Sequence, residues 1–189
     1  SINRDVCWIP YNIKQQINKY PIFFKGVVVY SQGIFNCASH FINLLEFWFG
    51  HCKNIIVANS NLSFNNELDP NPEFDIQFNN AQFKFLPNNN LDFFHNSIDM
   101  FSSYQRIKYE NSGRDIYIYK IKKDEIYDTN NVFSSKPIHL KSDFNKIQFQ
   151  VVDNLSLFLK GKKYNLCDIE SGLTTLKVLN SIKKQLKCL

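Results

Sequence analysis

Several features that would point directly to a function are missing from this sequence. Its six glycines, at positions 26, 33, 50, 113, 161 and 172, nowhere form G-x-G-x-x-G after a strand, so the chain as given is not expected to bind a dinucleotide well. No apolar run approaches the roughly 20 residues that span a bilayer, and no charged-then-apolar leader opens the chain. We therefore expect a cytoplasmic protein with no membrane partner.

Cysteine and methionine usage excludes further classes. The five cysteines are odd in number and form no CxxC pair, which suits a reducing compartment better than a disulfide scaffold. Cys37 and His40 offer metal ligands, as do His51 and Cys52, but a continuous helix would separate the two pairs by about 15 Å, too far for one zinc ion. We therefore predict no metal site.

The only methionine is Met100 and the first residue is Ser1, which indicates a fragment, a processed product or an expressed piece.

What is present indicates one globular domain. The 189 residues are 44% hydrophobic and 15% aromatic, with 18 phenylalanines, which is enough for a single core and short for two. The net charge is +5, and part of the basic excess lies late, in Lys160, Lys162, Lys163, Lys183, Lys184 and Lys187. We interpret these lysines as solvated helix faces, with an anionic or nucleic-acid partner as the alternative.

The most informative stretch runs from Gly33 to Gly50. At helical spacing one face carries the apolar residues Ala38, Phe41, Ile42, Leu45, Trp48 and Phe49. A different face carries Asn36, His40 and Asn43, spaced i, i+4, i+7. This pattern predicts a helix that buries one side against a sheet and points an imidazole and two amides elsewhere.

Around that helix the patterning predicts an α+β fold. The expected elements are a short helix within residues 1–20, strands at 21–30 and 54–60, a hairpin over 73–86, one strand over 97–109 with a bend in the middle, a strand at 115–123 paired with its second part, a loop with one short strand over 124–141, a helix capped by Asp143, and a helix capped by Asp168. In the last helix we expect the buried side to comprise Leu173, Leu176, Leu179, Ile182 and Leu186. Successive strands favour an open, largely antiparallel sheet with helices packed on one face, the other face being used for oligomerisation.

Three stretches resemble the C-terminal domain of the Gfo/Idh/MocA oxidoreductases, the glucose–fructose oxidoreductase and inositol dehydrogenase family. Residues 33–45, GIFNCASHFINLL, are similar to the start of the family's central helix, which carries two aspartates and a histidine. Residues 107–113, IKYENSG, are similar to its hairpin, and residues 168–179, DIESGLTTLKVL, to its terminal helix. Asn3 and Arg4, with Pro10 downstream, look like the segment that opens this domain.

The resemblance implies a function. Family members place a Rossmann domain for NAD or NADP before this domain, which binds a sugar or cyclitol and oligomerises through its sheet. The histidine that matches His40 is the usual proton acceptor or relay. Asn36 and Asn43 stand where the family has aspartates, and asparagine at the first position recurs in relatives acting on nucleotide-linked amino sugars.

We therefore expect residues 1–189 to be a single substrate-binding and oligomerisation domain, the C-terminal part of an NAD(P)-dependent sugar or nucleotide-sugar dehydrogenase. His40 is the candidate base, and Asn36, Asn43, Arg4 and Tyr30 are candidate substrate ligands. Without the missing Rossmann domain the fragment should bind no cofactor and be inactive. The simpler interpretation is a helix histidine with a satisfied hydrogen bond and no catalytic part, a capping amide and a surface amide at Asn36 and Asn43, and a surface arginine at Arg4.

Two other classes stay open. The two Asp-to-Asn departures would suit a non-catalytic scaffold or assembly protein that keeps the fold, because an amide cannot take a proton. Aromatic and cationic residues on the predicted strands could form a single-strand nucleic-acid surface; they are Tyr104, Arg106, Lys108, Tyr117, Tyr119 and Lys122. We rank this third alternative last, because aromatic strands more often form a core or an interface.

Overall fold

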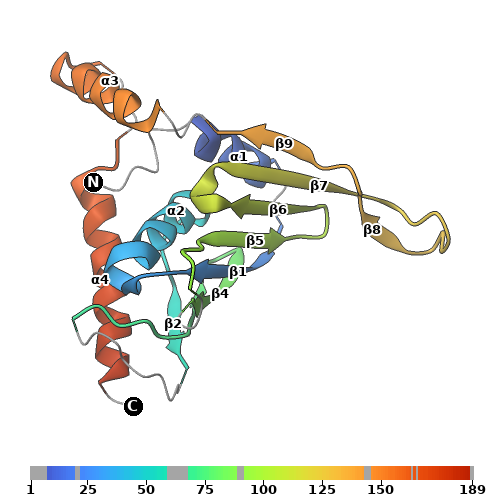
Figure 1. The fold of residues 1–189 in the computed structure, drawn as a ribbon, viewed down its shortest axis with the longest axis horizontal. Coiled ribbons are helices and arrows are strands. Elements are labelled where there is room, and N and C mark those ends of the chain that lie inside the picture. Colours follow the sequence, from blue (N-terminus) through green and yellow to red (C-terminus); the bar gives the residue numbers. More distant parts are fainter. Residues whose placement is uncertain are drawn as a thin grey trace.

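The structure is a computed structural model that describes residues 8–19, 22–58, 68–88, 92–142, 146–162, 164 and 166–187. It confirms the α+β class, with helices against one face of an open sheet of nine strands (Figure 1). The strands are β1 (Phe24–Tyr30), β2 (Asn54–Val57), β3 (Phe74–Gln77), β4 (Ala81–Pro87), β5 (Ser97–Phe101), β6 (Gln105–Glu110), β7 (Asp115–Lys123), β8 (Asn131–Phe133) and β9 (Ile138–Lys141). Among the described residues, no helix is long and apolar enough to cross a membrane.

The strand order is β2-β3-β4-β1-β5-β6-β7-β8, and β9 pairs with β7. Every strand pair is antiparallel except β1 with β4, which runs in parallel. A parallel pair needs a crossover connection, and here the central helix lies between the two strands in the sequence. That helix is therefore held over the middle of the sheet.

The helices are α1 (Trp8–Asn18), the π-helix η1 (Gly33–Ala38), α2 (Ser39–Phe49), the short 3-10 helix η2 (Asn111–Gly113), α3 (Ile147–Leu159) and α4 (Ile169–Leu186). The central helix α2 packs against both α1 and α4. Its apolar side faces the sheet, where Trp48 and Phe41 lie edge-on to the ring of Tyr109 in β6. Helix α3 projects from one end of the molecule, away from this layer (Figure 1).

Several sequence predictions are confirmed at the level of single elements. Asn79 and Asn80 separate β3 from β4 as a hairpin turn, and β6 pairs with β7. Asp168 caps α4, because its Oδ1 accepts the N–H of Ser171 at 2.8 Å. Asp143 lies outside the described residues.

Other predictions need correction. The single strand expected over 97–109 is two strands, β5 and β6, because the Ser102 hydroxyl accepts the N–H groups of Tyr104 and Gln105 and closes a turn. The segment 124–141 contains two short strands rather than one. In α4, Leu179 and Ile182 are buried and Leu186 packs against the core, as predicted. Leu173 and Leu176 are instead exposed, and Thr175 and Val178 are buried. The first half of the helix therefore buries a different side from the one expected.

Candidate active site

The central helix begins with an unusual backbone. Gln32 and Gly33 both have positive φ, 59° and 88°, which turns the chain from β1 into η1. Residues 33–38 then wind as a π-helix before α2 begins at Ser39. Short π segments concentrate at functional sites, since they shift side chains relative to an ordinary helix. Nothing in the residue pattern of this segment indicates π winding.

A neighbouring loop occupies the free N–H groups of this helix start. Asp69 accepts the N–H of Phe35 at 2.7 Å and that of Asn36 at 3.1 Å, one on each carboxylate oxygen. The N–H of Gly33 donates to Asn71 Oδ1 at 2.5 Å. A helix N-terminus attracts negative charge, because its first N–H groups have no partner within the helix. The Asp69 carboxylate accepts two of these N–H groups and so ties the start of the helix to the neighbouring loop. These three hydrogen bonds fix the position of the backbone from which the Asn36 side chain projects.

Two of the predicted site residues, Asn36 in η1 and His40 in α2, lie on the same exposed side of this helix. The side chains of Asn36 and His40 are both exposed and lie one turn apart. The Asn36 amide makes a long 3.4 Å bond to Gln32 Oε1, which leaves it able to bind another group. Nearby protein atoms partly desolvate the imidazole and lower the pKa of His40. The ring is therefore neutral, and able to accept a proton, near neutral pH.

The exposed face of α2 lies between two other helices. On one side, α1 places the Lys14 Nζ 4.1 Å from the centre of the Phe47 ring. On the other side, Asn43 bonds to Thr175 of α4. At about 100° per residue, His40 lies close to Phe47 around the helix and about 60° from Asn43, so α1 approaches the side of α2 that carries His40, and α4 covers the Asn43 side.

Asn43 has a different place from the one expected. It is fully buried, and its amide donates to Thr175 Oγ1 at 2.9 Å and to Ser171 O at 3.4 Å. The Thr175 hydroxyl lies 2.9 Å from Glu46 Oε2, so a buried polar network joins α2 to α4. This corrects the expectation that Asn43 binds substrate: it holds two helices together.

Tyr30 is a second correction. Its side chain is fully buried, and its hydroxyl donates to Pro72 O at 2.5 Å. Burial raises the pKa of this phenol, and the nearby Asp69 and Glu73 charges act in the same direction. A sugar cannot reach it. Arg4, the remaining candidate ligand, lies outside the described residues.

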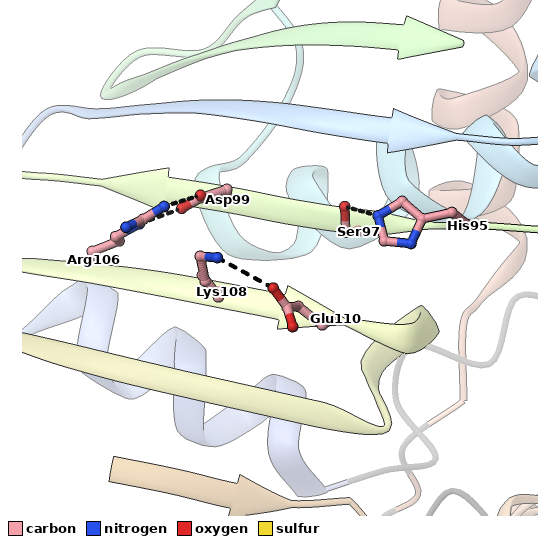
Figure 2. A network of polar contacts seen from close by, with 6 residues as sticks. All are labelled: His95, Ser97, Asp99, Arg106, Lys108 and Glu110. Atoms are coloured by element: carbon pink, nitrogen blue, oxygen red, sulfur yellow. Dashed lines mark hydrogen bonds and ion pairs between the residues drawn. The ribbon is translucent and has the colours of Figure 1, made fainter. Parts of the chain in front are cut away.

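The opposite, open face of the sheet carries a second polar cluster, of which the residue pattern singled out only Arg106 and Lys108, as part of the nucleic-acid alternative. Figure 2 shows its side chains on β5, on β6 and just before β5. The guanidinium of Arg106 forms two bonds to the Asp99 carboxylate, Lys108 Nζ lies 3.3 Å from Glu110 Oε1, and His95 Nε2 lies 3.1 Å from Ser97 Oγ. These groups line a groove of about 590 Å³ together with apolar side chains; the other lining residues are Val27, Val29, Ile98, Phe101 and Phe133.

The pairing of these charges bears on the nucleic-acid alternative. Arg106 and Lys108 were candidates for phosphate contacts, and both do lie beside tyrosines, since Arg106 pairs with Tyr119 and Lys108 with Tyr117 across β6 and β7. Each cation, however, already has a carboxylate partner within the chain. Phosphate binding would have to displace those partners, so the geometry gives this alternative no support.

Comparison with known proteins depends on structure alone. No protein-family model matches the chain, and no curated protein sequence matches it. Among solved structures, the chain is similar to a putative NADPH-dependent oxidoreductase from Desulfitobacterium hafniense, with 12% identity, a TM-score of 0.71, and coverage of 99% of this chain and 62% of that one. The WlbA dehydrogenase from Bordetella pertussis, solved with NADH and UDP-GlcNAcA, gives 14% identity, a TM-score of 0.62, and coverage of 96% and 59%.

A third similar structure has a different role. It is a super-repressor mutant of Gal80p from Saccharomyces cerevisiae, with 12% identity, a TM-score of 0.72, and coverage of 97% of this chain and 61% of that one. The chain thus spans about three fifths of the length of these solved chains. The layout of helix layer, open sheet and terminal helix is the common part. The fold of this chain is that of the C-terminal domain of the Gfo/Idh/MocA-type oxidoreductases.

Proposed function

We propose that this chain is the substrate-binding domain of an NAD(P)-dependent dehydrogenase that oxidises a secondary hydroxyl of a sugar or nucleotide sugar, with His40 as the base. One observation carries the proposal. In a domain of this fold, Asn36 and His40 lie one turn apart on an exposed helix face, and Asp69 holds the start of that helix by accepting two of its N–H groups. Neither side chain is used in the core.

The chemistry fits those two residues. The neutral His40 imidazole can accept the hydroxyl proton as the carbon loses hydride, and its lowered pKa keeps it in that form. The Asn36 amide can both donate to and accept from sugar hydroxyls, which fixes the sugar ring beside the imidazole. A nicotinamide cofactor, when bound, supplies the hydride acceptor. The described residues include no glycine-rich strand–turn–helix to hold it, so it would be held by a separate nucleotide-binding domain.

The substrate class follows from Asn36 and from one neighbour. Asparagine at this position resembles relatives that act on nucleotide-linked amino sugars, and the WlbA dehydrogenase was solved with such a compound. We therefore favour a nucleotide sugar over a free cyclitol. Oligomerisation through the open face of the sheet completes the proposal, because the groove there combines apolar side chains with charges that are already paired within the chain.

The test uses the longest polypeptide whose reading frame contains this chain. We expect His40→Asn to abolish NAD(P)-dependent oxidation of a UDP-amino sugar, with a loss of about 100-fold or more in kcat and a small change in KM. His51→Asn is the matched control, since this exposed histidine lies just beyond the far end of α2, about 16 Å away along the axis. Equal activity of the two variants would contradict the role of His40.

A non-catalytic scaffold is the second candidate. The replacement of both family aspartates by Asn36 and Asn43 favours it, and the similarity to Gal80p, a protein described as a repressor, gives a precedent for this fold in regulation. The same assay decides between them. A folded polypeptide that binds NAD(P) but turns over no UDP-amino sugar, with or without His40, would support the scaffold.

A further inference from the structure

One lysine of α4 reaches the start of the helix that carries the candidate site. Lys183 Nζ lies 5.4 Å from the centre of the ring of Phe35, the residue of η1 that immediately precedes Asn36. Lys183 is half-buried, whereas Lys184 and Lys187 nearby are exposed. For the late lysines, an anionic partner was the alternative to a solvated helix face. Lys183 brings one of these charges to the helix start beside Asn36.

This ammonium group is available to a ligand. Within the part of the chain that the structure describes, no carboxylate oxygen lies within 4.0 Å of Lys183 Nζ. The face of the Phe35 ring attracts the cation, but it leaves N–H groups of the ammonium able to donate to an oxygen. Arg106 and Lys108 on the open face of the sheet differ, because each has a carboxylate partner. An anion can therefore bind Lys183 without displacing a described ion pair.

The backbone at the start of η1 offers an anion little. A helix N-terminus ordinarily binds phosphate through its free N–H groups. Here three of these groups already donate to the side chains of Asp69 and Asn71. An anion bound beside Asn36 therefore has to be neutralised by a side chain, and Lys183 carries the charge for it.

We propose that Lys183 binds a phosphate group of a nucleotide-sugar substrate and so makes the site prefer a phosphorylated sugar to a free one. This inference rests on the proposed function. Along the helix, the imidazole of His40 meets the hydroxyl that is oxidised, the Asn36 amide meets the sugar ring, and Lys183 beside Phe35 meets the phosphate on the anomeric carbon. From His40 to Phe35 the helix rises by about 7.5 Å, which leaves room for the ring between base and cation.

This role differs from that of His40 in its kinetic signature. The phosphate does not take part in the transfer of hydride, so its contact with Lys183 is equally strong in the bound substrate and in the transition state. Loss of such a contact raises KM and leaves kcat unchanged. Loss of the base does the opposite, because the proton is transferred only in the reaction itself. Lys183 is therefore a residue of substrate specificity, and His40 is the residue of the chemical step.

Binding of UDP and of uridine tests this site without a requirement for turnover. Both ligands are titrated calorimetrically into the longest polypeptide whose reading frame contains this chain, with NAD(P) at saturating concentration. Lys183→Met keeps an unbranched apolar side chain against Phe35 but removes the charge. We expect it to weaken UDP binding by about 10- to 100-fold and to leave uridine binding unchanged, because uridine has no phosphate.

Two further variants are the controls. Lys184→Met removes the same charge from the adjacent, exposed position and should change the affinity for UDP by less than about twofold. Lys183→Arg keeps the charge and should retain most of the affinity for UDP. For the UDP-amino sugar, Lys183→Met should raise KM by the same factor as it weakens UDP binding, with kcat within about twofold of the unchanged polypeptide.

The outcomes separate this inference from the proposed function. If UDP binds no more tightly than uridine, or if Lys183→Met and Lys184→Met weaken UDP binding equally, Lys183 is not the phosphate ligand. Oxidation that depends on His40 would then leave the proposed function intact. Conversely, UDP binding that depends on Lys183 in a polypeptide without His40-dependent oxidation would support the phosphate site and contradict the proposed function.

Discussion

At the scale of single residues, the environment of His40 predicts a pH profile. Desolvation disfavours the imidazolium, so the pKa of His40 lies below the ordinary value of about 6.5. The neutral ring is the competent base. In the longest polypeptide, kcat/KM for the UDP-amino sugar should therefore fall as the pH drops through a pKa below about 6.5, and stay level from there to neutral pH. A profile that falls with a midpoint at or above about 7 would contradict the assignment of His40 as the base.

Gly33 allows a prediction about the stability of the helix start that carries the candidate site. Its φ of 88° is unfavourable for any other residue, and a Cβ at this position would lie 2.1 Å from the Asp69 carboxyl carbon. Gly33→Ala must therefore strain the backbone and also displace the carboxylate that accepts the N–H groups of Phe35 and Asn36. We expect a loss of about 2–5 kcal/mol in the free energy of unfolding, measured by urea denaturation.

Gly50→Ala is the matched control for that measurement. Gly50 also has a positive φ, 83°, but a Cβ added to it would meet nothing within 4 Å. It should show the backbone strain alone, about 1–3 kcal/mol. The excess for Gly33→Ala then measures the Asp69 contact. Equal losses in the two variants would show that Asp69 contributes nothing to holding the helix start.

At the scale of elements, the buried network between α2 and α4 predicts a difference between adjacent threonines. Thr175→Val keeps the side-chain shape but removes the hydroxyl that lies between Asn43 and Glu46, leaving buried polar groups without that partner. We expect a loss of about 1–3 kcal/mol in unfolding free energy. Thr174→Val removes only a bond to Glu170 O within α4 and should cost about 0.5 kcal/mol or less. Similar losses would contradict the role of this network in joining the helices.

The elements also show which parts of the site could be predicted from sequence. Helical spacing placed Asn36, His40 and Asn43 on one side of α2, and two of them are exposed together as expected. Asn43 is buried because α4, more than 120 residues later in the chain, docks against its edge of that side. Spacing within one helix carries no information about such a distant contact. The same holds for the start of η1, whose N–H groups at Phe35 and Asn36 donate to Asp69, more than 30 residues later in the chain.

Tyr30 differs, because local sequence did contain the answer. In a strand, alternate residues face the same side, and Tyr30 shares its side with Phe24 and Val28. All three are buried, so alternation alone would have placed Tyr30 in the core.

Strand order, in contrast, could not be predicted from local sequence. The hairpins were predictable from turns, whereas the parallel pairing of β1 with β4 depends on a long crossover that leaves no local pattern.

At the scale of the whole molecule, the open face of the sheet is where we expect a second copy to bind. An interface can bury charges only if they are paired, since an uncompensated buried charge costs about 3–5 kcal/mol. Here Arg106 is already bonded to Asp99 within the chain. Packing two such faces together would therefore bury the apolar groove residues beside charges that already have partners within the chain.

Because Arg106 and Asp99 neutralise each other, reversing one of the two charges should weaken self-association, whereas exchanging the two charges should leave it nearly unchanged. Arg106→Asp places two carboxylates side by side in the interface and should weaken self-association by roughly 100- to 1000-fold, measured by sedimentation velocity. The double variant Asp99→Arg with Arg106→Asp restores an internal pair and should associate nearly as the unchanged chain does. If both variants associate equally well, the open face is not the interface. If neither does, these two residues contact the partner chain directly rather than neutralising each other. Loss in Arg106→Asp with recovery in the double variant is the pattern that an interface of internally paired charges requires.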